Sequence, residues 1–380
     1  MLWRRRATSS FPPFASSDVT WYYLGRNAVF RAVIQLGIGD GEVLMPSYHH
    51  GVEVEAVAAA GARPRFYRVG RSWEVDLEDL EARIGPRTRA LYLTHFAGFP
   101  GPIAELRALA DRRGLVLIED CALSLLSSDR GTPLGTTGDA RIFCLYKTLP
   151  VPHGGALSLS DDAPQLGRHE RPRPAPLSST SSHILSSLLA NFELRAGAPG
   201  RMVRHAVLAA GRRTLDAAQV RRVGTGTAHF ERRHAELGMS RLARRLARVQ
   251  DPASIVEHRR RNYAILLAGL RDRVPPLFDT LPGGVSPLFY PLVVERKAAV
   301  LRALWARGIE AVDFWSTSHP SCDLEEFPEV AWLRRSVIEV PCHQDLSRRR
   351  AIRVLDAVRE SIDACRAAGL HRGGSPARYS

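Results

Sequence analysis

Apolar residues between about positions 25 and 160 recur with two spacings, one typical of helices and one typical of strands. Stretches with the helical spacing stop at Gly37, Gly61 and Gly114, and glycine is a common residue just after a helix. Residues 115–118 are continuously apolar, as in a strand buried on both faces. Alternating helices and strands predict βαβ units and a sheet covered by helices. Helices are predicted at 27–36, 52–60, 77–84 and 103–113, and strands at 42–45, 65–69, 90–94, 115–119, 141–145 and 154–157.

The pattern changes between about 161 and 235. The Pro-rich residues 171–176 and the Ser/Thr cluster 178–182 predict a linker. A basic amphipathic stretch at 184–213 follows, which we interpret as a pair of surface helices. A helix that docks on a partner or on a membrane surface is the alternative.

The remaining chain predicts a second α/β unit. Residues 240–270 have helical spacing and predict one long helix, and the pattern at 287–357 predicts a small α/β domain. The Gly/Ser/Pro-rich tail from Gly373 is predicted to be disordered. We expect an N-terminal arm at 1–20, a large α/β domain at 21–240 with a divergent basic insert at about 161–235, a linking helix and small domain at 241–370, and a tail at 371–380.

The composition is that of a globular protein with an excess of positive charge. Of the 380 residues 45% are hydrophobic and 24% charged, and the formal net charge is +14. Such an excess fits an anionic ligand or a genome that favours arginine. No nucleic-acid-binding module and no basic stripe with interleaved aromatic residues is present, so we expect no nucleic acid partner. A phosphorylated or nucleotide-linked substrate explains the charge equally well.

Cysteine and apolar patterns point to a cytoplasmic protein. The five cysteines are scattered without a CxxC pair, which argues against a disulfide framework and a structural zinc site. The adjacent residues His49 and His50 would point to opposite faces of a strand, so no metal site is expected there. The basic start of the chain lacks the apolar core of a signal peptide, and no apolar run reaches the roughly 20 residues of a membrane span.

Asp120 and Lys147 are the strongest candidates for chemistry. Asp120 ends a buried strand, where open α/β sheets bind ligands, although such a carboxylate can also be a helix cap. Lys147 lies 27 positions later between two strand-like stretches, and by itself could be a surface lysine. Together they match pyridoxal phosphate (PLP) chemistry, which needs a lysine amine for a Schiff base and an acid that keeps the pyridine nitrogen protonated.

Short motifs follow one another in order around this pair: 37–43 (GIGDGEV), 45–48 (MPSY), 61–64 (GARP), 86–90 (PRTRA), 118–122 (IEDCA), Gly154 and Gly155 after Lys147, and 340–347 (VPCHQDLS). Together they resemble the PLP-dependent sugar aminotransferases of the DegT/DnrJ/EryC1/StrS family. The likeness covers about residues 25–160 and resumes more weakly at 239–360. It implies fold type I of the PLP transferases and a homodimer.

The resemblance also implies roles for individual residues. Lys147 would carry the cofactor and move protons, Asp120 would pair with the ring nitrogen, and Ala122 and His50 would pack on the two ring faces. The remaining candidates are Gly25, Arg26 and Asn27 for the phosphate at a helix N-terminus, Cys144 beside them, and His319 and His343 for the substrate.

Three departures from the family pattern stand out. Leu123 replaces a Gln or His that contacts the ring hydroxyl, and the phosphate-binding Ser before the lysine is absent, with Cys144 or Tyr146 as a stand-in. The Asn that reaches the neighbouring subunit's phosphate is also absent, where we place Glu236 or Leu237.

The function expected from the sequence is transfer of an amino group, from glutamate, to a nucleotide-linked keto-sugar. One alternative is PLP chemistry on another carbonyl or amino-acid substrate. The other is a scaffold of PLP-enzyme fold that has lost catalysis.

Overall fold

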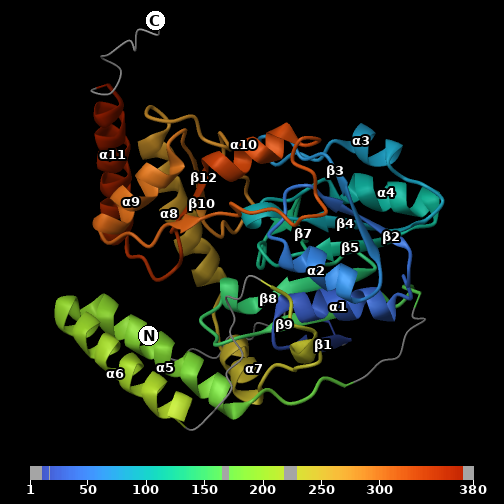
Figure 1. The fold of residues 1–380 in the computed structure, drawn as a ribbon, viewed down its shortest axis with the longest axis horizontal. Coiled ribbons are helices and arrows are strands. Elements are labelled where there is room, and N and C mark those ends of the chain that lie inside the picture. Colours follow the sequence, from blue (N-terminus) through green and yellow to red (C-terminus); the bar gives the residue numbers. More distant parts are fainter. Residues whose placement is uncertain (1–10, 17, 165–170, 218–228, 371–380) are drawn as a thin grey trace, which may run out of the picture.

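The computed structural model describes residues 11–16, 18–164, 171–217 and 229–370. Its largest element is a seven-stranded sheet with the strand order β1-β9-β8-β5-β4-β2-β3, seen on the right of Figure 1. The five strands from β8 to β3 run parallel, and β9 and β1 are antiparallel to their neighbours. The predicted α/β class is confirmed. The strands are β1 (Val19–Tyr22), β2 (Glu42–Pro46), β3 (Arg63–Tyr67), β4 (Thr88–Thr94), β5 (Val116–Asp120), β8 (Ala140–Cys144) and β9 (Gly155–Leu159).

Four helices accompany these strands, close to the predicted positions. Asp76 caps α3 by accepting a hydrogen bond from the Asp79 N–H, and α4 ends where Gly114 takes the left-handed conformation, at φ 62°. The central strand β5 is fully buried at Leu117 and Ile118, as its apolar run predicts. The helices are α1 (Gly25–Gln35), α2 (Val52–Ala59), α3 (Leu77–Ala82) and α4 (Ile103–Arg113), with the 3-10 turns η2 (Phe96–Gly98) and η3 (Leu145–Lys147) and the small hairpin β6 (Ser128–Asp129) and β7 (Thr132–Pro133).

A second, three-stranded antiparallel sheet lies in the C-terminal part of the chain, with the order β10-β12-β11 and its own apolar core. The prediction of one helix over 240–270 is wrong. Asp251 accepts hydrogen bonds from the N–H groups of Ala253 and Ser254, and Pro252 lacks an N–H, so a new helix begins there. The elements are α7 (Arg241–Arg248), α8 (Pro252–Leu270), β10 (Tyr290–Val293), α9 (Lys297–Ala306), β11 (Val312–Asp313), α10 (Pro328–Ser336), β12 (Val337–Val340) and α11 (Arg348–Leu370).

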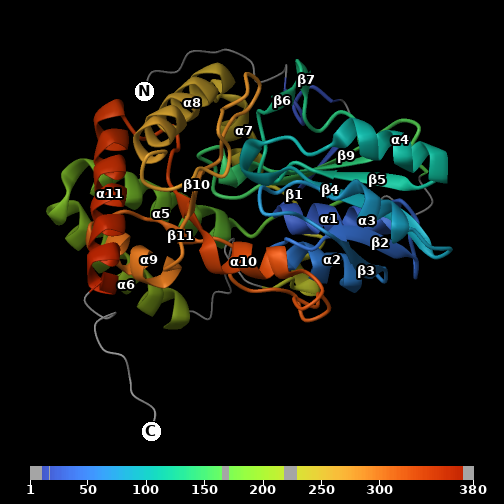
Figure 2. The same cartoon turned by 90° about the horizontal axis from the view of Figure 1, so that it is seen from above.

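Two long helices, α5 (Leu177–Ala196) and α6 (Ala198–Ala217), form a hairpin that projects from the body at the lower left of Figure 1. The predicted helix pair is confirmed. The Ser/Thr cluster 178–182 was predicted as a linker and lies instead in the first turns of α5, where Ser181 and Ser182 bond to backbone carbonyls behind them. Figure 2 shows the hairpin beneath α9 and α11.

Residues 1–10 of the predicted arm and the predicted tail from Gly373 lie outside the described residues. The proposed domain bounds, at 240 and 370, stay a prediction. Among the helices of the described residues, none is long and apolar enough to cross a membrane.

Candidate active site

Asp120 and Lys147 meet because neighbouring parallel strands end at the same edge of the sheet. Asp120 is the last residue of β5 and pairs in register with Ile142 of β8. Lys147 closes the 3-10 turn that begins directly after β8. The carboxyl edge of an open α/β sheet is where ligands bind. The two residues that the sequence singled out are therefore brought together.

Asp120 is a buried carboxylate held in a fixed orientation. Its Oδ1 accepts the Ala122 N–H at 2.8 Å, and its Oδ2 accepts the Tyr92 hydroxyl at 2.8 Å. Burial raises the pKa of Asp120 above its ordinary value, while these two donors and the charge of Lys147 lower it. Such a carboxylate is poised for a cationic N–H partner, whose charge would offset the burial.

Lys147 lines a cavity of about 1410 Å³ together with His50 and Leu123. Within the described part of the chain, its ammonium forms no hydrogen bond or ion pair. It is also one of only two lysines in the chain, the other being Lys297, although 53 residues are Lys or Arg. Lys297 is buried and donates to the carbonyls of Phe314 and Arg334, which is a structural role.

The wall of the cavity beside Lys147 is apolar and aromatic. Leu123 is buried, and the His50 ring meets Trp315 edge-on with ring centres 6.3 Å apart. Burial, with the charge of Lys147, lowers the pKa of His50 to about 4. The imidazole is therefore neutral at pH 7 and can lie flat against another ring.

The N-terminus of α1 lies beside Lys147 as well. No side chain caps this helix, and no acidic residue occupies its first turn. A Cβ added at Gly25 would lie 3.2 Å from the Cβ of Cys144, so β8 and α1 approach as closely as a glycine permits. Tyr146 interacts with both Arg26 and Cys144. The group combines helix N–H groups with a guanidinium and a phenol, which suits an anion.

Not every predicted phosphate contact is directed at this anion site. Asn27 donates its side-chain N–H to the carbonyl of His234 at 2.7 Å, and Arg26 donates to the carbonyl of His229 at 2.8 Å. Cys144 is buried, and burial raises the pKa of its thiol, which is therefore neutral. Gly25 and Tyr146 remain the closest structural match to the predicted site.

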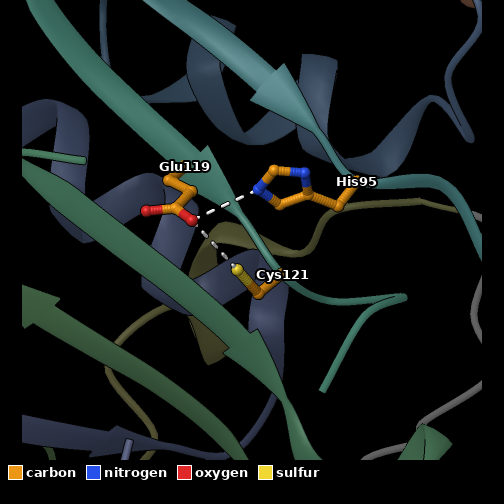
Figure 3. Close-up of side chains that lie close together, drawn as sticks. All are labelled: His95, Glu119 and Cys121. Atoms are coloured by element: carbon orange, nitrogen blue, oxygen red, sulfur yellow. Dashed lines mark hydrogen bonds and ion pairs between the residues drawn. The ribbon is translucent and has the colours of Figure 1, made fainter. Parts of the chain in front are cut away.

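His95, Glu119 and Cys121 form a compact buried cluster (Figure 3). The three residue types could hold a metal ion, but the hydrogen bonds assign them another role. His95 Nδ1 accepts the Gly101 N–H at 2.9 Å, so Nε2 carries the proton and donates it to Glu119 Oε1 at 3.2 Å. Glu119 also accepts the N–H groups of Gly135, Thr137 and Gly138. The cluster thus ties the 135–138 turn to the strand that carries Asp120.

Residues 25–168 match the model of the DegT/DnrJ/EryC1/StrS aminotransferase family. This confirms the predicted resemblance. Among curated relatives, GDP-perosamine synthase of Vibrio cholerae is 34% identical over 142 residues, which are 36% of this chain and 39% of that protein. The dTDP-3-amino-3,4,6-trideoxy-alpha-D-glucose transaminase of Micromonospora megalomicea subsp. nigra is 38% identical over 143 residues, 36% of this chain and 38% of that protein. The match therefore spans about two fifths of each relative.

Solved structures of aminotransferases share the fold over nearly the whole chain. The aminotransferase TlmJ from Streptoalloteichus hindustanus superposes with a TM-score of 0.64 at 22% identity, covering 92% of this chain and 86% of that one. Helicobacter pylori PseC gives a TM-score of 0.65 at 14% identity, covering 91% and 87%. The fold shared with these structures thus extends through the C-terminal sheet, beyond residues 25–168.

Of the two histidines predicted to contact the substrate, only His343 lines the cavity. His343 lines the cavity, with Nδ1 3.7 Å from Asp345 Oδ2. His319 bonds to Ser321 at 2.7 Å and is not among the lining residues of the cavity. His49 is fully buried and stacks on Phe66, and neither His49 nor His50 lies in a strand, so the expected strand geometry at this pair is wrong.

Three residues that matter to the site escaped the sequence reasoning. Tyr92 orients Asp120, and Glu339 lines the cavity, where burial raises its pKa to about 7 against the lowering effect of Lys147. Arg334 of α10 donates to the carbonyls of Trp315 and His49, at 2.7 and 3.1 Å, and so holds the two loops that bear Trp315 and His50. Tyr92 could have been found from the sequence, because it lies two residues before the end of β4. The roles of Glu339 and Arg334 depend on contacts with residues far away in the sequence.

Proposed function

We propose that this chain is a PLP-dependent aminotransferase that moves an amino group, from glutamate, to a nucleotide-linked keto-sugar. The observation that carries the proposal is the pairing of Lys147, which has no partner among the described residues, with the oriented carboxylate Asp120 at one edge of the sheet. The family match over residues 25–168 supports the same reaction class. Curated relatives named as a GDP-perosamine synthase and a dTDP-amino-sugar transaminase support the sugar substrate.

The residues present fit PLP. A lysine amine is available to bind the aldehyde, and a buried acid with both oxygens already oriented is available for the ring nitrogen. The uncapped α1 N-terminus suits the phosphate. The Leu123 side chain has no hydrogen-bonding group for the ring hydroxyl, so Lys147, Asp120 and the α1 N-terminus would hold the cofactor without that contact. When bound, PLP supplies an electron sink for the carbon that exchanges its amino group.

Lys147 and Asp120 would have separate roles in the proton chemistry. Asp120 would accept a hydrogen bond from the ring N–H of the cofactor, because a buried carboxylate is stabilised by a positive partner. The Lys147 amine would act as the base that moves a proton at the reacting carbon. Lys147 lines the cavity, where a substrate would lie.

The neighbouring residues orient the reactants. His50 and Ala122 would contact the two faces of the ring, and the neutral state of His50 avoids a cation against it. Leu123 and Trp315 keep that part of the cavity apolar and limit the entry of water. Gly25, with Tyr146, would hold the phosphate. We also propose a homodimer, which sedimentation equilibrium would detect as twice the chain mass.

The test uses the scarcity of lysine. PLP-loaded protein is reduced with borohydride, which fixes the cofactor on the lysine that holds it, and the peptides are analysed by mass spectrometry. We expect the cofactor mass on the Lys147 peptide and none on the Lys297 peptide, an internal control. Lys147→Ala should remove the visible absorption band, and glutamate should discharge that band in the wild type.

Two further outcomes decide between the alternatives. Amino transfer from glutamate to keto-sugar nucleotides would establish the substrate. Discharge of the band by glutamate without turnover of any sugar nucleotide would favour another carbonyl substrate. No cofactor on either lysine would contradict the proposal and leave the scaffold interpretation.

A further inference from the structure

The cavity at Lys147 is larger than a cofactor and a sugar need. Its volume of about 1410 Å³ exceeds the roughly 300–1,000 Å³ of ordinary small-molecule sites. From Lys147 it extends to the α5–α6 hairpin and to α11, two elements far apart in the sequence. At that far end the lining changes from apolar to charged, with arginines from three elements: Arg201 and Arg204 of α6, Arg350 and Arg353 of α11, and Arg307 after α9.

The hairpin forms one wall of this cavity. Glu193 of α5 lines the cavity and pairs with Arg204 of α6 at 2.8 Å. This pair joins the two helices of the hairpin where they line the cavity, and Arg201 lies one turn before Arg204 on α6.

Two of the five arginines at this end form ion pairs with carboxylates, and two others form none within the described part of the chain. Arg204 pairs with Glu193, and Arg307 pairs with Glu360 at 3.1 Å. Arg201 and Arg353 form no ion pair or side-chain hydrogen bond with the residues that the structure describes. The carboxylates Glu310 and Asp356 also line this end of the cavity. The positive charge is therefore concentrated at the unpaired arginines and does not extend over the whole wall.

We infer that Arg201 and Arg353 bind the diphosphate of a nucleoside-diphosphate-linked substrate, with the α5–α6 hairpin as the wall that makes this subsite. The inference rests on the proposed function and assigns to the hairpin a part of substrate recognition. Guanidinium groups bind phosphate oxygens through two parallel N–H bonds, which suits a diphosphate reached from two walls. The sugar would extend from there toward Lys147.

The experiment measures binding of UDP, dTDP and GDP to PLP-loaded protein by isothermal titration calorimetry, with the corresponding nucleosides as phosphate-free probes. We expect Arg201→Ala and Arg353→Ala each to weaken binding of the preferred diphosphate about tenfold or more, since a charged hydrogen bond is lost. The matched control is Arg335→Ala, an exposed arginine of α10 outside the cavity. Discharge of the cofactor band by glutamate should be unchanged in all three variants.

Three results would overturn the inference. Equal affinity in the wild type and both variants would show that the diphosphate does not contact these arginines. A nucleoside that binds as tightly as its diphosphate would remove the role of the phosphates. Lack of binding of any nucleoside diphosphate to protein that still forms the cofactor band would reject the subsite alone, whereas loss of that band would reject the proposed function instead.

Discussion

The hydroxyl of Tyr92 on β4 donates a 2.8 Å hydrogen bond to Oδ2 of Asp120 on the neighbouring strand β5. Both side chains are buried. The Tyr92 hydroxyl occupies one lone pair of Asp120 Oδ2, and other lone pairs of the carboxylate would remain for the ring nitrogen of the cofactor. The bond lowers the pKa of Asp120, against the larger effect of burial. A carboxylate placed to hold a cationic ring is thus kept charged in part by a tyrosine that does not line the cavity.

Tyr92→Phe should therefore weaken cofactor binding about tenfold, because one charged hydrogen bond, worth about 1.5 kcal/mol, is removed from Asp120. The affinity is measured by titrating apoprotein with PLP and following the visible band. Tyr67→Phe is the matched control: Tyr67 is equally buried, and its hydroxyl bonds to the Tyr92 carbonyl at 2.9 Å, not to Asp120. An equal loss of PLP affinity in both variants would argue for general loosening of the sheet.

Glu119→Gln should destabilise the protein by about 3 kcal/mol, since an amide cannot accept all the donors that converge on this carboxylate. Burial alone would raise the pKa of Glu119, but His95 and the backbone N–H groups outweigh it and lower the pKa. The contribution of Glu119 is thus present above its ordinary pKa and is lost as the pH falls through the lowered one. Urea unfolding at pH 7 and pH 4 should show the difference in stability between wild type and Glu119→Gln shrinking at the lower pH.

Glu339→Gln should stabilise the protein at pH 8 by up to about 3 kcal/mol, because the buried carboxylate is then ionised in the wild type. Burial raises the pKa of Glu339 to about 7. Because the pKa is raised in the folded protein, protonated Glu339 does not destabilise the fold at a pH below the ordinary pKa of glutamate. Stability is then lost as the pH rises to about 7, since the carboxylate must ionise in its desolvated position. Thermal unfolding of both forms between pH 5 and pH 8 checks this. A difference that does not grow with pH would show that Glu339 does not titrate in this range.

His50→Phe should keep PLP affinity within about twofold, whereas His50→Ala should weaken it about tenfold through loss of the ring-to-ring contact. The pKa of His50 is lowered to about 4, so the imidazole does not titrate between pH 5 and pH 8. Replacing His50 should therefore leave the pH dependence of PLP affinity unchanged in that range. Titrations of the visible band across that range provide the measurement. A transition near pH 6.5 in the wild type that is absent from His50→Phe would show that the imidazole charges during binding.

The sequence by itself determined the local elements of the parallel sheet and the reactive pair. Continuous apolar strands, helix-ending glycines and caps act over a few residues, so α4 and β5 could be placed to within one residue. Asp120 and Lys147 could be paired because both follow strands that a parallel sheet brings to one edge. Where composition alone was used, the prediction was wrong: the Ser/Thr cluster 178–182 resembles a linker but lies in the first turns of α5, where Thr180 is buried and hydrogen-bonds to His153.

Only the tertiary structure decided which distant residues complete the site. Arg334 reaches the loop of His49 across 285 positions, and Arg201 and Arg353 enter one cavity from two helices 152 positions apart. Such contacts depend on how the two sheets and the hairpin pack, and no local spacing encodes that packing. Tyr92 and Glu339 gained their roles in the same way, because burial and a neighbouring charge arise only once the chain has folded around them.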